Sequence, residues 1–87
     1  MKSYDVLWSD EAEDQLIGLT ALETNRSRCV EAIRQIETKL RDDPYHCSPV
    51  HEGLWAFEVL EFRSLFEIHD SESVVRVVSF RDLTLDA

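Results

Sequence analysis

The chain has 87 residues, of which 44% are hydrophobic, and its nine basic and eighteen acidic side chains give a formal net charge of −9. A chain of this length suits one domain with one two-layer core, so we expect a single domain over residues 1–87. The negative charge repels polyanions at long range, which excludes nucleic-acid binding unless a local basic surface outweighs it. The charge otherwise favours a basic partner, or it serves only to keep the domain in solution.

No stretch of the sequence is apolar for long enough to span a bilayer, and Met1–Trp8 contains no apolar region of a signal peptide. We therefore expect a cytoplasmic protein with no membrane partner. In that compartment Cys29 and Cys47 are expected to be reduced rather than joined in a disulfide.

A strand is predicted over residues 2–8, because apolar and polar side chains alternate there. Ser9 follows as the N-cap of a first helix, with acidic residues in the first turn, where the helix dipole favours them. This helix is predicted to run to about Thr20, and its apolar face consists of Ala12, Leu16 and Leu19.

A second helix is predicted to start from an N-cap at Thr24 or Asn25 and to end before Pro44, because the residue before a proline avoids helical geometry. Apolar residues recur along it at intervals of three and four, and polar residues fill the opposite face. The predicted apolar stripe comprises Cys29, Val30, Ile33, Ile36 and Leu40.

After a loop over residues 44–52, three runs rich in β-branched and aromatic residues predict consecutive hairpins: Leu54–Leu60, Phe62–His69 and Val74–Phe80. The resulting order predicts an α+β fold with two N-terminal helices packed on a four-stranded, mostly antiparallel sheet (β-α-α-β-β-β). The predicted core comprises Trp8, Leu16, Ile33, Ile36, Trp55, Phe57 and Phe66.

Two groups of side chains could carry chemistry. His46, Cys47, His51 and Glu52 are able to bind metals, but they lack the paired spacing of a zinc site, so an ordinary polar loop is the simpler interpretation. Arg63 lies in an apolar strand and Arg81 ends the last strand. An arginine in such a place either forms a salt bridge with a carboxylate or serves a site. We expect no metal and no cofactor.

Several motifs resemble those of the RelE/ParE toxin superfamily across nearly the whole chain. Strand Tyr4–Trp8, which leads into an acidic helix start, is similar to the opening of that family, and Leu40–Pro44 is similar to its helix exit. Gly53–Val59 resembles its Gly-Leu-Trp-Glu-Leu-Arg-Val strand, and Phe62–Ile68 resembles its Tyr-Arg-x-x-Tyr-x-Ile strand. The resemblance implies a RelE/ParE-like fold and a toxin–antitoxin context.

RelE-type members cut mRNA in the ribosomal A site with basic residues, and ParE-type members inhibit DNA gyrase. The resemblance makes Arg63 and Arg81 the catalytic candidates, because they match the family's strand arginine and the basic residue after its last strand. The match is incomplete. Glu58 stands where the family's strand has arginine, Ala56 and Glu58 lie near the two lysines of RelE itself, and Asp82 lies in the region of the family's terminal tyrosine.

These substitutions predict a toxin component, or a degenerate toxin-like homologue, of a type II toxin–antitoxin system whose inhibitory activity is reduced or lost. The alternatives are an active ribosome-dependent mRNA endoribonuclease and a non-catalytic protein-interaction module. The implied partner is an antitoxin protein, and a homodimer remains open. The ribosome or mRNA is a partner only of an active enzyme.

Overall fold

A computed structural model describes residues 3–21 and 23–85. In this part of the chain, strand β1 (Asp5–Trp8) leads into helices α1 (Asp10–Thr20) and α2 (Glu23–Asp42). Strands β2 (Ser48–His51), β3 (Leu54–Val59), β4 (Phe62–His69) and β5 (Val74–Asp82) follow. Short 3₁₀ turns lie at Pro44–His46, Asp70–Glu72 and Leu83–Leu85. Neither helix of the described residues combines the length and the apolar character that crossing a bilayer requires.

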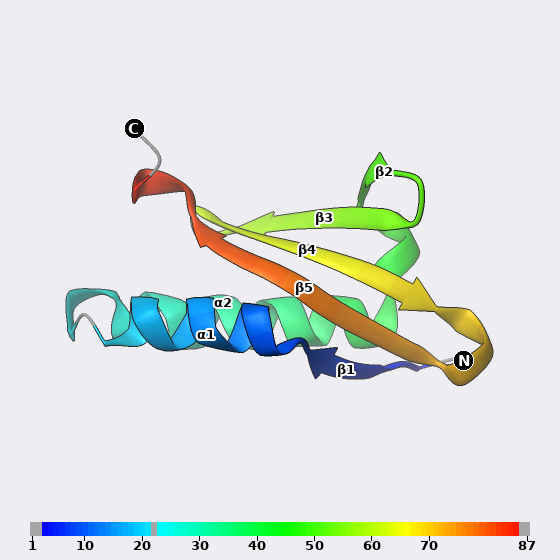
Figure 1. Cartoon of the computed structure of the whole chain (residues 1–87), viewed down its shortest axis with the longest axis horizontal. Helices are drawn as coiled ribbons and strands as arrows, with labels where there is room; N and C mark the ends of the chain where they lie inside the picture. The colour runs from blue at the N-terminus through cyan, green and yellow to red at the C-terminus, as the bar shows by residue number, and fades with distance from the viewer. Residues whose placement is uncertain (1–2, 22, 86–87) are drawn as a thin grey trace.

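The strands form one mixed sheet in the order β1-β5-β4-β3-β2, and both helices cover one face of it (Figure 1). Strand β1 is parallel to β5, and the other neighbours are antiparallel. The predicted α+β class is therefore confirmed, with five strands in place of four. The additional strand is β2, inside the predicted loop 44–52. All four of its residues are exposed, so its burial does not alternate as in the other strands. It is a strand because its backbone pairs with β3.

The start of α1 agrees with the sequence prediction, whereas the start of α2 does not. The Ser9 side chain accepts a hydrogen bond from the Ala12 backbone N–H at 3.1 Å, as an N-cap does. Helix α2 already begins at Glu23, so Thr24 and Asn25 lie inside it and the predicted cap at either residue is wrong. Residue 22, which precedes this helix, lies outside the described residues.

The hydrophobic core lies between the helices and the covered face of the sheet. Ile36 and Phe66 of the predicted core are fully buried. Four other predicted members are partly buried and pack against this core: Trp8, Leu16, Trp55 and Phe57. The largest contributions that the sequence patterns missed come from Phe62, Phe80, Val75 and Val77.

The buried side of α2 keeps three of the five predicted residues and gains Ala32. It consists of Cys29, Ala32, Ile36 and Leu40, all fully buried. Successive helical residues are about 100° apart, so Val30 lies beyond the edge of this stripe and is 59% exposed. Ile33 is half-buried and lies outside the core cluster. The predicted core roles of Val30 and Ile33 are therefore wrong, and the small side chain of Ala32 allows close packing instead.

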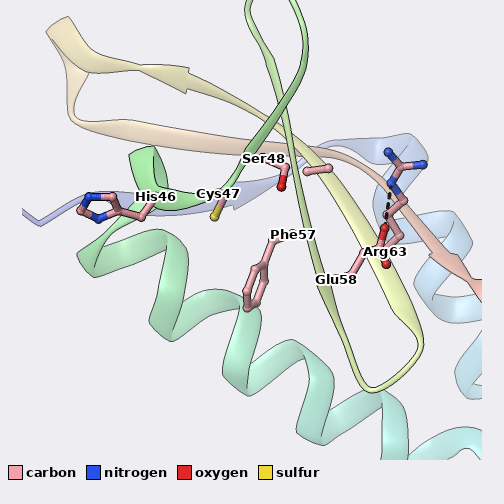
Figure 2. A pocket seen from close by; sticks show the side chains of 7 residues that line it. His46, Cys47, Ser48, Phe57, Glu58 and Arg63 are labelled. Atoms are coloured by element: carbon pink, nitrogen blue, oxygen red, sulfur yellow. Dashed lines mark ion pairs between the residues drawn. The ribbon is translucent and has the colours of Figure 1, made fainter.

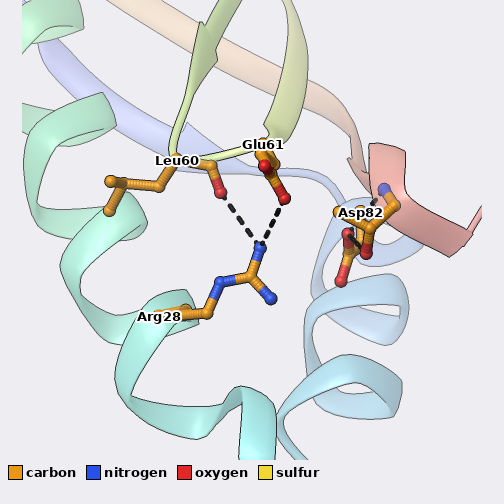
Figure 3. Close-up of polar contacts among 5 residues, drawn as sticks. Arg28, Leu60, Glu61 and Asp82 are labelled. Carbon is orange, nitrogen blue, oxygen red and sulfur yellow. Dashed lines mark hydrogen bonds and ion pairs between the residues drawn. The ribbon is translucent and has the colours of Figure 1, made fainter.

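The β3–β4 hairpin turns through two residues with left-handed backbone, Leu60 (φ 52°) and Glu61 (φ 67°). Such turns normally use asparagine and glycine, since a β-carbon makes this conformation costly. Arg28 of α2 donates hydrogen bonds to the Leu60 carbonyl at 3.3 Å and to the Glu61 carboxylate at 3.4 Å (Figure 3). Its guanidinium also lies 5.1 Å from the centre of the Phe62 ring. These contacts stabilise the turn from the side of the helix.

Candidate functional site

The two arginines predicted from the sequence lie directly opposite each other in the sheet. Arg63 of β4 pairs in register with Arg81 of β5 on one side and with Glu58 of β3 on the other. Directly opposed residues of antiparallel strands project to the same face. Their neighbours Phe62 and Phe80 are buried in the core, so this row of three charges lies on the face that the helices leave uncovered.

Glu58 and Arg63 form an ion pair, in which Glu58 Oε2 lies 3.6 Å from Arg63 Nε. The two side chains are 58% and 38% exposed, and the Arg63 Nε atom itself is shielded from solvent. Within the described residues this Nε has no partner at hydrogen-bond distance. The salt bridge that the sequence left open as an alternative for Arg63 is therefore present.

Arg81 is exposed and contributes the second positive charge of the row. Like charges that face each other across two strands destabilise a sheet by a few tenths of a kcal/mol to about 1 kcal/mol. Glu58 offsets this repulsion from the other side of Arg63. The row as a whole therefore carries one excess positive charge on a strongly negative chain.

A pocket of about 400 Å³ opens beside this row, and the chain segment before β2 forms its second wall (Figure 2). It is lined by His46, Cys47, Ser48, Ala56, Phe57, Glu58 and Arg63. Glu58 and Arg63 are the carboxylate and guanidinium of this lining, so their charges balance. The lining of this pocket therefore has no net formal charge, although the row beside it carries one excess positive charge.

His46 lines the same pocket but not the same end of it. In Figure 2 its ring points away from Arg63. Its Nδ1 atom lies 2.5 Å from a carboxylate oxygen of Asp43, and this hydrogen bond holds the pKa of Asp43 below its usual range. An imidazole that is turned away and bonded to Asp43 is poorly placed to take a proton from a group bound at Arg63.

The four metal-capable residues of the predicted loop do not converge. His46 and Cys47 line the pocket, whereas His51 ends β2 and Glu52 follows it in the turn to β3. Burial raises the pKa of the Cys47 thiol, which disfavours the thiolate that a metal needs. In residues 3–21 and 23–85, no group of three or more histidine, cysteine, aspartate or glutamate side chains has the geometry of a metal site.

Sequence reasoning named the arginines but missed the partner of Arg63. A signal for it existed: a two-residue turn at Leu60–Glu61 pairs Val59 with Phe62, and therefore Glu58 with Arg63. No sequence pattern indicated the pocket itself. It depends on β2, which pairs with β3 although all four of its residues are exposed.

The element order, the helices on one face and the mixed sheet define an α+β fold, and the following structural comparison bears out the RelE-like fold that the sequence motifs implied. Among solved structures, the chain is similar to the toxin–antitoxin complex RelBE2 from Mycobacterium tuberculosis, with a TM-score of 0.75 and 18% sequence identity. The alignment covers 94% of this chain and 93% of that one. No family model and no curated protein matches the sequence.

Proposed function

We propose that this chain is the toxin component, or a degenerate toxin-like homologue, of a type II toxin–antitoxin system, and that its inhibitory activity is reduced or lost. Its remaining capacity would then be to bind an antitoxin-like protein. The likeness in fold to a chain of the RelBE2 complex supports the toxin–antitoxin context. The Glu58–Arg63 ion pair carries the claim of reduced activity.

In a RelE-type reaction, Arg63 and Arg81 are the residues that would bind the scissile phosphate. Stabilising a transition-state phosphate needs donors that are free to point at it, together with a base for the ribose hydroxyl. Here Glu58 competes with the phosphate for Arg63, and the imidazole of His46, which lines the same pocket, points away from Arg63. A phosphate would have to displace a carboxylate within a neutral pocket, which weakens both its binding and its activation.

An active ribosome-dependent mRNA endoribonuclease is the second candidate. One observation favours it: Arg63 and Arg81 face each other across β4 and β5, so one phosphate could contact both. The neutral pocket argues against it and is equally compatible with a non-catalytic protein-interaction module.

Induction of the protein alone in a bacterial host tests the proposal. We expect growth close to that of the R63A/R81A double variant, which lacks both phosphate-binding candidates. Glu58→Arg alone is expected to leave growth unchanged, because it supplies a charge but no base. Prompt growth arrest with mRNA cut at codon boundaries in the A site, abolished in R63A/R81A, would replace the proposal with the ribonuclease function.

Binding measurements separate the possible partners. A labelled RNA hairpin should show no measurable binding at about 150 mM salt, where long-range attraction is screened and the net charge opposes phosphate. The product of the neighbouring reading frame, coexpressed with this chain, should copurify with it if it is an antitoxin. Micromolar RNA binding that R63A/R81A removes would show that the two arginines outweigh the net charge.

A further inference from the structure

A second groove lies between α1 and the end of β5, and it shares no lining residue with the Arg63 pocket. Its volume is about 310 Å³, and it is lined by Asp14, Gln15, Gly18, Leu19, Phe80, Arg81 and Asp82. Gln15 bonds the helix to the strand, because its Oε1 accepts a hydrogen bond from the Phe80 backbone N–H at 2.7 Å. The helix and the strand that form the walls of the groove are therefore fixed to each other by this hydrogen bond.

Asp82 supplies a buried carboxylate to this groove. The residue is only 4% exposed, and its Oδ1 accepts hydrogen bonds from the backbone N–H and the hydroxyl of Thr84, at 2.9 and 2.6 Å. Its Oδ2 is also buried, yet no donor in the described residues reaches it. Figure 3 shows Arg28 bonded to Leu60 and Glu61, with Asp82 to one side. A buried carboxylate oxygen without a donor is costly, and a positive charge in the groove would lower this cost by electrostatic attraction.

The surroundings of Asp82 favour a cation. Helix α1 carries four carboxylates and no basic residue: Asp10, Glu11, Glu13 and Asp14. Asp14 lines the groove together with Asp82, whereas exposed Arg81 is its one basic lining residue. Two carboxylates against one guanidinium leave the groove negative, and the charged helix beside it attracts cations at long range.

The groove also has an apolar part and room for a side chain. Leu19 and Phe80 line it, and Ile17, next to Gly18 on the same helix, is 64% exposed. A β-carbon added at Gly18 would meet no atom within 4 Å, so the space above this glycine is open. A side chain with an apolar stem and a cationic end matches these features.

We propose that this groove is the docking site of the partner protein, which inserts an arginine so that its guanidinium lies beside the carboxylates of Asp14 and Asp82. The arginine stem lies against Leu19, and an adjoining apolar side chain covers Ile17. The identity of this partner as an antitoxin rests on the function proposed above, whereas the chemistry of the site does not.

The site is tested first with a small probe, N-butylguanidinium, in an NMR titration of the full chain. We expect saturable shifts of the amides of Gly18, Phe80 and Asp82, and no such shifts with N-butylurea, its uncharged isostere. Asp82→Asn should weaken binding about tenfold or more, because the guanidinium loses its attraction to a poorly solvated carboxylate. Glu13→Gln removes the same charge outside the groove and should change the affinity less than twofold. Equal binding by D82N and the parent, or equal shifts with the urea, would overturn the proposal.

A second pair of variants tests the groove without altering charge. Gly18→Leu fills the open space, and Gly18→Ala is its matched control on the same helix. If the product of the neighbouring reading frame binds the parent, G18L should weaken that complex at least tenfold, whereas G18A should not. A complex that G18L leaves intact would refute the docking site while the proposed function stands. Saturable guanidinium binding without any such complex would support the site and count against the toxin–antitoxin function.

Discussion

Strand β4 presents two very different environments on alternate residues. Phe62, Ser64 and Phe66 are fully buried against the helices, whereas Arg63, Leu65 and Glu67 are partly exposed on the other face. The covered face gains free energy from burial of apolar area. The uncovered face holds charges whose pairs are screened by water and contribute little to folding.

Because of this difference, residues that determine stability and residues that determine binding alternate along one strand. Substitutions on the covered face change how much protein is folded, and substitutions on the uncovered face change what a folded protein can bind. The α1–β5 groove is an exception, because Asp82 is as buried as a core residue and still lacks a donor on one oxygen. Four measurements test this separation.

The largest effect is expected for Phe66→Ala. Removal of a fully buried ring should lower the free energy of unfolding by about 3–5 kcal/mol, because the lost contacts leave a cavity. Leu65→Ala, one residue away on the uncovered face, should cost about 1 kcal/mol or less. Urea denaturation of both variants measures the contrast. Equal losses would show that the uncovered face is packed against something in solution.

On helix α2, Ile36→Ala should cost about 2–5 kcal/mol, since Ile36 is fully buried. Ile33→Ala should cost about 1 kcal/mol, because Ile33 is half-buried and outside the core cluster. Thermal unfolding of the two variants tests the position of the buried stripe. If I36A melted within a degree or two of the parent, the assigned face of the helix would be wrong.

A smaller effect of opposite sign is expected at the β3–β4 turn. Replacing Leu60 and Glu61 by asparagine and glycine should raise the free energy of unfolding by roughly 0.5–1.5 kcal/mol, because these residues accept left-handed backbone more readily. Arg28→Ala should lower it by about 1 kcal/mol through loss of the hydrogen bonds to the turn. Chemical denaturation distinguishes the two directions, and a destabilised L60N/E61G variant would contradict the assigned turn geometry.

The smallest effect is expected for the charged row. Glu58→Gln and Arg63→Ala should each change the free energy of unfolding by less than about 1 kcal/mol, because both side chains are substantially exposed. Ser79→Ala, on the same face of β5, serves as a control for substitution without loss of charge. A loss of several kcal/mol in E58Q would mean that the ion pair is a stability element rather than a constraint on binding.

Much of the fold could be predicted from the sequence because it depends on local patterns. Runs of β-branched and aromatic residues marked the strands around Trp55, Phe66 and Val77, and apolar spacing marked the buried side of α2 at Ile36 and Leu40. The N-cap role of Ser9 and the helix end before Pro44 follow from backbone chemistry within a few residues. Motifs on these same elements indicated the RelE/ParE-like fold.

Other features could not be predicted from local patterns, because they depend on contacts between residues that are distant in the chain. Strand β2 forms by pairing with the edge of β3, although its own residues are all exposed and show no strand-like alternation of burial. The choice of Ala32 over Ile33 for the core reflects how closely the helix approaches the sheet. The burial of Asp82 arises where α1 meets the end of β5, about sixty residues apart in sequence. Local periodicity can show that a residue faces inward, but the groups that surround it there are set by the packing of the whole chain.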